Sequence, residues 1–80
     1  MQETIAQRLR DALAIEHLEI SMDGNRCALL VVSDDFDGLG AVKRQQLVYQ
    51  HIGEFISSGE IHAVSINAIT GEQWRAQSSS

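Results

Sequence analysis

The sequence predicts a small two-layer α+β domain, in which a three-stranded mixed sheet carries helices mainly on one face. Two segments repeat their apolar residues with the period of a helix, and three others show the alternation or the short apolar runs of strands. The longer helical segment separates the last two strands, and such a crossover makes the strands it joins parallel, with a right-handed connection. The expected order is therefore helix, strand, strand, helix, strand, helix.

The first helix is predicted over residues 4–14. Ile5 and Leu9 fall on one helical face, which gives this segment an apolar side for packing against the sheet. Thr4 and Gln7 have the spacing of a capping box, in which each side chain accepts a hydrogen bond from the backbone N–H of the other residue. The helix is therefore expected to begin at Thr4.

A β-hairpin is predicted next. Leu18, Ile20 and Met22 alternate with polar residues, as in a half-buried strand. Asp23-Gly24 is expected to form a two-residue turn, because tight hairpin turns favour residues that accept positive φ. This turn would pair Met22 with Asn25 across the hairpin.

Cys27 begins the returning strand, which runs to Val32 and is almost continuously apolar. In the expected register the Cys27 side chain points to the buried face of the sheet, while Arg26 points the opposite way. The thiol is therefore expected to behave as a small buried apolar group with a raised pKa, poorly suited to nucleophilic or ligand work. The residues expected to share its face are Leu18, Ile20, Leu29 and Val31.

The second half of the chain is predicted to contain a loop, the crossover helix, a third strand and a short last helix. Phe36 is expected to anchor the loop, and Gly59 to end the crossover helix. The apolar stripe of that helix comprises Val48, Ile52, Phe55 and Ile56. The predicted bounds are a start near Ala41 for the helix, Ile61 to Ala68 for the strand and Glu72 to Gln77 for the last helix.

Size and charge favour one soluble domain. The 80 residues allow a single domain, expected over residues 1–77 with a frayed polar tail at 78–80. A net charge of −5 opposes unspecific binding to nucleic acid or anionic lipid. The longest apolar run is too short to cross a membrane, and the N-terminus has no apolar signal core. With one cysteine and no internal disulfide, a cytoplasmic location without a membrane partner is expected.

The topology places one histidine at the rim of the sheet. Parallel strands start at the same end of a sheet, so the strands that begin near Cys27 and Ile61 both start where the hairpin turns. His62 is then expected to lie close to Asp23 and Cys27. Such a histidine is either a solvated, hydrogen-bonded side chain at a strand start or a ligand held at the rim, and the pattern alone leaves both interpretations open.

Four segments together resemble the BolA family. They are LLVVSDDFDG, VKRQQLVYQHI, IHAVSINAIT and EQW, and the resemblance covers nearly the whole chain. The combined pattern of V-S-x-x-F-x-G, V-Y and I-H-A-x-S-I is specific, and KRQQ before LVY is most similar to the short bacterial branch of the family. The resemblance implies a class II KH-like fold, which agrees with the element order above.

For function, the resemblance implies iron–sulfur cluster handling with a monothiol glutaredoxin and, separately, transcriptional control under stress. The histidine of the family's I-H-A motif, here His62, would ligate a [2Fe-2S] cluster shared with the glutaredoxin and glutathione. Such clusters usually need four ligands, mostly thiolates. One well-placed histidine and one cysteine cannot complete this set, so the partner is expected to bring the rest.

The second ligand implied by the family, a histidine or cysteine of the hairpin loop, has no clear equivalent in this chain. Arg26 stands at the histidine position, and a guanidinium cannot ligate iron. The substitutes are Cys27, Asp23 and His17. Gly71 replaces the proline that usually precedes EQW, a departure that affects only the start of the last helix.

A nucleic-acid-binding transcriptional regulator is the alternative function. The KH-like order and the helix-turn-helix resemblance of residues 36–52 suggest it, with Lys43 and Arg44 as the contacts to DNA. Three aspartates within residues 34–37 flank these cations, however. The chain also lacks the GXXG loop with which KH domains clamp a nucleic-acid backbone.

An enzyme is the weakest option, and no catalytic residue is predicted. Cys27 is expected to be buried, and no third group orients a thiol–base pair formed with His62. A homodimer is left open by the sequence.

Overall fold

The elements follow the predicted order. The computed structural model describes residues 1–78, so Ser79 and Ser80 of the predicted tail lie outside the described residues, whereas Ser78 ends the last helix. The elements are α1 (Gln2–Ala12), β1 (Ile15–Asp23), β2 (Arg26–Ser33), the 3₁₀ turn η1 (Asp34–Phe36), α2 (Ala41–Ser57), β3 (Ala63–Ile69) and α3 (Gly71–Ser78).

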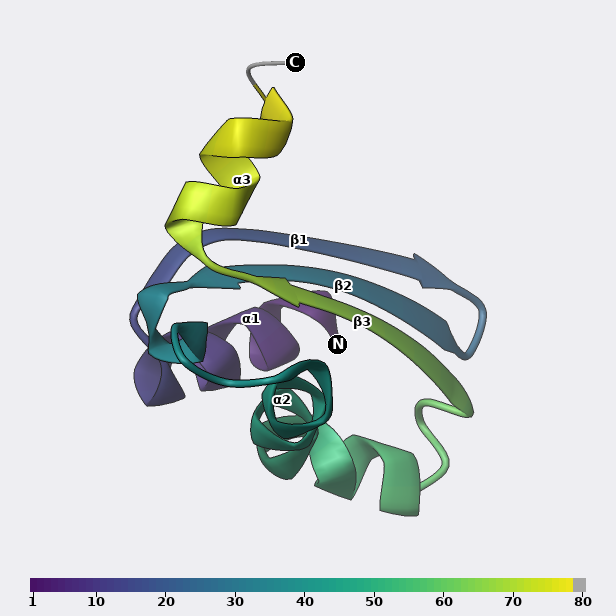
Figure 1. Ribbon diagram of the computed structural model, residues 1–80. Helices are drawn as coiled ribbons and strands as arrows, with labels where there is room; N and C mark the ends of the chain where they lie inside the picture. The colour runs from purple at the N-terminus through teal and green to yellow at the C-terminus, as the bar shows by residue number, and fades with distance from the viewer. Residues whose placement is uncertain (79–80) are drawn as a thin grey trace.

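The three strands form a mixed sheet with β2 at its centre. β1 pairs with β2 antiparallel, and β2 pairs with β3 parallel, in the order β1-β2-β3. Figure 1 shows α1 and α2 under one face of the sheet, while α3 leaves the end of β3 on the other side. This arrangement confirms the predicted α+β class, its crossover and the placement of most helices on one face.

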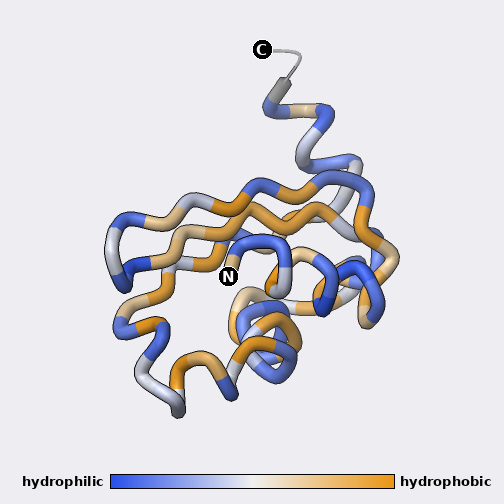
Figure 2. Tube along the Cα trace, turned by 180° about the vertical axis from the view of Figure 1, so that it is seen from behind, coloured by the Kyte–Doolittle hydropathy of each residue, from blue (hydrophilic) through white to orange (hydrophobic). Residues whose placement is uncertain are grey.

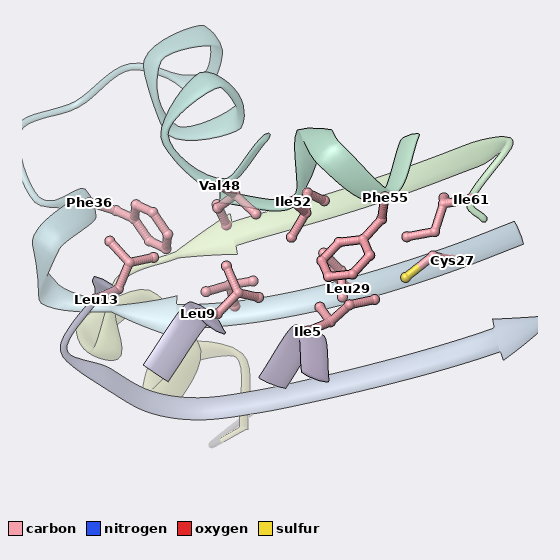
Figure 3. Close-up of a cluster of buried hydrophobic side chains, with 12 residues drawn as sticks. Ile5, Leu9, Leu13, Cys27, Leu29, Phe36, Val48, Ile52, Phe55 and Ile61 are labelled. Atoms are coloured by element: carbon pink, nitrogen blue, oxygen red, sulfur yellow. The ribbon is translucent and has the colours of Figure 1, made fainter. Parts of the chain in front are cut away.

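The hydrophobic core lies between the sheet and the pair α1 and α2 (Figure 3). Phe36 is fully buried at one end of it, which confirms that this side chain anchors the loop after β2. Burial of a large apolar side chain contributes about 1.5–3 kcal/mol, so this single layer provides most of the stability of a chain this short. The core residues are Ile5, Leu9, Leu13, Cys27, Leu29, Val31, Phe36, Val48, Ile52, Phe55, Ile61 and Ala68.

The hairpin turn differs from the prediction by one residue on each strand. Asp23 pairs with Arg26, so the two turn residues are Gly24 and Asn25, and the predicted pairing of Met22 with Asn25 is wrong. Gly24 has φ 61°, the only positive φ in this turn, which fits a type II′ turn with glycine at its first central position. Glycine adopts positive φ without steric cost, whereas Asp23 would be strained there.

The shift does not change which residues face the core. The turn is displaced by one residue on both strands, so the cross-strand pairs change but each side chain keeps its face of the sheet. Cys27 is 3% exposed and pairs with Met22, whose side chain also packs against the core. The predicted burial of Cys27 and the exposure of Arg26 are therefore confirmed.

The capping box occurs at the last helix and not at the first. α1 begins at Gln2, its N-cap Met1 has no side-chain cap, and the predicted box of Thr4 and Gln7 is wrong. At α3, Thr70 Oγ1 accepts a hydrogen bond from the Gln73 backbone N–H (3.2 Å), and Gln73 Oε1 accepts one from the Thr70 N–H (3.0 Å). The spacing of Thr70 and Gln73 is the same Thr-x-x-Gln signature.

Candidate functional site

The start of β3 lies beside the hairpin turn, as the topology predicts. The backbone N–H of His62 donates to the Asn25 carbonyl (2.8 Å), and that of Ala63 donates to the same oxygen (3.4 Å). Ala63 then pairs with Arg26 in the parallel register. The backbone of His62 is therefore fixed to the hairpin at the rim of the sheet.

The His62 side chain is exposed to solvent. Within residues 1–78, no hydrogen bond or ion pair engages its ring. The ring lies beside Gly59, where a Cβ atom would sit 3.8 Å from His62 Nε2. Gly59 has φ 85° and follows the end of α2, so the residue that terminates the helix also leaves this side of the imidazole free of a side chain.

The thiol of Cys27 lies inside the core. Figure 3 shows its sulfur on the helix side of the sheet, near Ile61 and Phe55. Burial removes water from the thiol, and this desolvation raises the pKa of Cys27 above its ordinary value. A neutral, covered thiol is a poor nucleophile and a poor metal ligand.

The other predicted ligands are divided between the two ends of β1. Asp23 is exposed at the hairpin, directly opposite Arg26 and thus near the start of β3. His17 lies six residues earlier on β1, roughly 20 Å away at the usual rise per residue. Its ring stacks on Trp74, with 4.4 Å between ring centroids. The structure therefore brings Asp23 and Cys27 to the end of the sheet that carries His62, and not His17.

A complete metal centre is absent from the part of the chain that the structure describes. No three histidine, cysteine, aspartate or glutamate side chains of residues 1–78 come together in a way that could hold a metal ion. Any metal group at the rim would therefore take most of its ligands from another molecule.

The two predicted DNA contacts have different surroundings. Arg44 Nε donates to the Leu39 carbonyl (2.8 Å), and its Nη1 donates to the carbonyl of Ala68 (3.2 Å) and to Gln73 Oε1 (2.8 Å). This guanidinium joins the start of α2 to the end of β3 and to α3. Lys43 is exposed next to it, so only Lys43 presents a free cation at this point of α2.

Two of the loop aspartates have structural partners. Asp35 Oδ2 accepts a hydrogen bond from the Ala14 N–H (2.9 Å), between α1 and β1, and Asp34 Oδ1 accepts one from the Gly71 N–H (3.3 Å) at the start of α3. These bonds fix η1 to the ends of two neighbouring elements. The acidic run is thus part of the scaffold.

The fold defines the class of protein: an α-β-β-α-β-α domain of the KH-like kind, with an exposed histidine just before its third strand. The family model described as BolA-like protein matches residues 9–73, and the chain belongs to this family.

Individual relatives agree with that assignment. The chain is 41% identical over 66 residues to the acid stress protein IbaG of Escherichia coli strain K12, an alignment that covers 82% of this chain and 79% of that protein. It is 33% identical over 87 residues to the DNA-binding transcriptional regulator BolA of Haemophilus influenzae, covering 96% and 84%. A Bol-like protein from Babesia bovis has a similar crystal structure, with a TM-score of 0.88 and 26% identity over 98% of this chain and 93% of that one.

Residues 1–78 contain no helix that is both long and apolar enough to cross a membrane.

Proposed function

We propose that this BolA-like protein is a non-enzymatic adaptor that binds a monothiol glutaredoxin and shares a [2Fe-2S] cluster with it, with His62 as a cluster ligand. The proposed setting is iron–sulfur cluster trafficking and iron homeostasis in the cytoplasm, as part of a stress response. The relationship to a protein named for acid stress supports the last part of this proposal.

One observation carries the proposal: the imidazole of His62 is exposed at the rim of the sheet, on a backbone that is held to the hairpin turn. Its backbone is fixed by the hydrogen bond to Asn25, while its ring is engaged with no other group of residues 1–78. Neutral imidazole is a good ligand for iron, and the backbone that carries this ring is already fixed before a partner's iron binds it.

The donor set fits a shared cluster and not a resident one. A [2Fe-2S] cluster takes four ligands, and this chain would supply His62. Asp23 is the exposed substitute for a second ligand, and Cys27 could serve only if the core opened above it. When bound, the cluster would be the cargo that passes between the two proteins, and the thiolates of the glutaredoxin and of glutathione would complete its coordination.

Reconstitution of the mixed complex tests the proposal. The purified protein is combined with a monothiol glutaredoxin, iron, sulfide and glutathione, and the mixture is resolved by size-exclusion chromatography with visible absorption. We expect a heteromeric complex whose visible spectrum differs from that of the glutaredoxin alone. If the two proteins elute separately under all conditions, with or without the cluster, the proposal is wrong.

A DNA-binding regulator is the second candidate, because one relative is named a DNA-binding transcriptional regulator. Its electrostatic support in this chain is small: the net charge is −5, and the guanidinium of Arg44 is occupied by three hydrogen bonds. A gel-shift titration at low salt distinguishes the candidates. Binding that weakens as salt rises and is lost in Lys43→Gln would favour this second function.

A further inference from the structure

One side of α2 is left uncovered by the fold. Its other sides pack against α1 and the sheet, and Figure 1 shows no element of residues 1–78 against the remaining one. On this outer side Val42 is 69% exposed and Tyr49 is 45% exposed. Figure 2 shows α2 as a mixture of hydrophobic and hydrophilic positions, whereas α3 is mostly hydrophilic. The helix therefore presents apolar side chains to solvent in addition to those it buries in the core.

The outer residues of α2 have the spacing of a helix–helix contact. Val42, Gln46, Tyr49 and Gly53, here called the outer stripe, follow one another at intervals of four, three and four residues. This alternation is the a/d spacing with which two helices pack side by side. The stripe contains no charged residue, so another helix can cover it without burying a charge.

The outer stripe also has room for side chains of an incoming helix. Gly53 has no side chain, and a Cβ atom there would lie 3.9 Å from Tyr49 Cε1. A second backbone can therefore approach α2 closely at this point. Beside Tyr49 lies a hollow of about 270 Å³, which is also lined by Gln45, Gln46 and Gln50. Its size allows it to receive a side chain.

Two opposite charges flank the outer stripe on the same side. Lys43 and Glu54 are eleven residues apart, which is close to three full helical turns. Lys43 is exposed and has no partner among residues 1–78. Glu54 forms an ion pair with Arg8 of α1, but its side chain remains 62% exposed. A cation near one end of the stripe and an anion near the other match the same flank of an antiparallel copy.

We propose that two copies of this chain associate through α2, with the two helices antiparallel about a twofold axis at the middle of the outer stripe. Such a contact is isologous, so every contact occurs twice. Lys43 of each copy lies beside Glu54 of the other. Val42 of each copy lies over Gly53 of the other, and the two Tyr49 rings meet at the hollow near the axis.

Self-complementarity favours a second copy over other partners of this surface. The stripe is neutral, and its flank carries one cation and one anion, so the surface does not attract a polyanion such as DNA. The association is expected to be weak, because one helix from each copy buries less than the roughly 1,200 Å² of stable complexes. The outer stripe does not include His62, so failure of this proposal would leave the proposed function untouched.

Concentration dependence tests the association. Sedimentation velocity in about 150 mM salt, which screens repulsion between two copies of net charge −5, should show monomers at about 10 µM and a mass rising toward the dimer near 1 mM. Amide chemical shifts should change with concentration on the outer side of α2. Tyr49→Asp, a change at an exposed position, should stay monomeric. A parent protein that stays monomeric near 1 mM, or shift changes confined to other elements, would overturn the proposal.

Charge reversal tests the antiparallel pairing. Lys43→Glu and Glu54→Lys each place like charges at both flanking contacts, so each variant alone should associate about two- to thirtyfold more weakly than the parent. An equimolar mixture of the two should associate again, because opposite charges then face each other at both contacts. Arg10→Glu and Glu3→Lys, the same changes on exposed positions of α1, are the matched controls and should associate like the parent.

Circular dichroism establishes that each variant is folded, which matters for Glu54→Lys because it also removes the ion pair with Arg8. A mixture that associates no more tightly than its two components would overturn the antiparallel pairing. Association that survives in Tyr49→Asp would overturn the assignment of the dimer to the outer stripe. His62→Ala should associate like the parent.

Discussion

The two ends of the sheet differ in how their polar groups are used. At the end that carries α3, the side chains of Asp34, Arg44 and Gln73 all form hydrogen bonds between different elements. At the hairpin end, the backbone of His62 is fixed, but its ring and the side chains of Asp23 and Arg26 have no such partners among residues 1–78. One end holds the domain together, and the other leaves coordinating and charged groups free for a second molecule.

This difference matters because the domain is small. A chain of 80 residues has a narrow margin of stability, so it gains from hydrogen bonds wherever side chains can reach a partner. Groups that stay unpaired at a rim with a fixed backbone are therefore informative. They can bind a partner without first breaking a hydrogen bond within the domain.

The largest expected effect is at the anchored end of the core. Phe36→Ala should lower the free energy of unfolding by about 3–5 kcal/mol, because it removes a fully buried aromatic ring and leaves a cavity. Trp74→Ala should cost less, since that side chain is only half-buried and lies outside the core cluster. Chemical denaturation measures both, with Tyr49→Ala, an exposed aromatic, as the control. A Phe36→Ala protein as stable as Tyr49→Ala would contradict the assigned core.

Substitutions of Cys27 test whether the core is well packed at the hairpin end of the sheet. Cys27→Ser should destabilise the fold by about 1–3 kcal/mol, because it places a hydroxyl on an apolar face, whereas Cys27→Ala should cost less than Cys27→Ser. Rapid labelling of the native thiol by an alkylating reagent near neutral pH would contradict its burial.

The raised pKa of Cys27 adds a pH dependence. The thiol ionises more readily in the unfolded chain than in the folded one, so its contribution to stability is complete below its ordinary pKa of 9.0 and decreases as the pH rises through the higher folded value. Urea denaturation at a series of alkaline pH values should show a steeper loss of stability in the parent than in Cys27→Ala.

Arg44 and Lys43 are neighbouring cations, and comparing the stability effects of their substitution distinguishes a side chain that joins elements of the fold from one that is free at the surface. Arg44→Ala should destabilise the protein by about 1–3 kcal/mol, because it removes the charged donor to the part-buried carbonyl groups of Leu39 and Ala68. Lys43→Ala should change stability by no more than about 0.5 kcal/mol, since the side chain is exposed. Thermal or denaturant unfolding checks the pair. Equal effects of the two substitutions would show that the three hydrogen bonds of Arg44 do not stabilise the fold.

The sequence was sufficient for the order of the elements and for the faces of the strands. The spacing of the apolar residues along the chain determines both. Side chains alternate between the two faces of a strand, so the predicted face of Cys27 is correct even though the predicted turn is displaced by one residue. The turn itself was missed because Asp23-Gly24 and Gly24-Asn25 are both acceptable turn pairs, and only the register with the returning strand separates them.

The long-range polar contacts were beyond the reach of local patterns. The Arg44 side chain bonds to Ala68 and Gln73, which lie 24 and 29 positions further along the sequence. His17 meets Trp74 only because α3 follows the end of β3, at the end of the sheet where β1 starts. By contrast, the capping box at Thr70 and Gln73 had a local signature that the sequence displays. At the candidate site, topology predicted that His62 lies beside the hairpin, but spacing could not show that its ring is unpartnered.

The proposed ligand role of His62 is tested most directly by the visible absorption and circular dichroism spectrum of the reconstituted glutaredoxin complex made with His62→Ala. We expect this variant to fold almost as stably as the parent, because an exposed rim side chain contributes little burial. Its complex should have an altered spectrum and a more labile cluster. Cys27→Ser, compared under conditions in which it stays folded, should leave the spectrum nearly unchanged. A complex that keeps the parent spectrum and cluster lifetime with His62→Ala, and loses its cluster with Cys27→Ser, would contradict the assignment of His62 as the ligand.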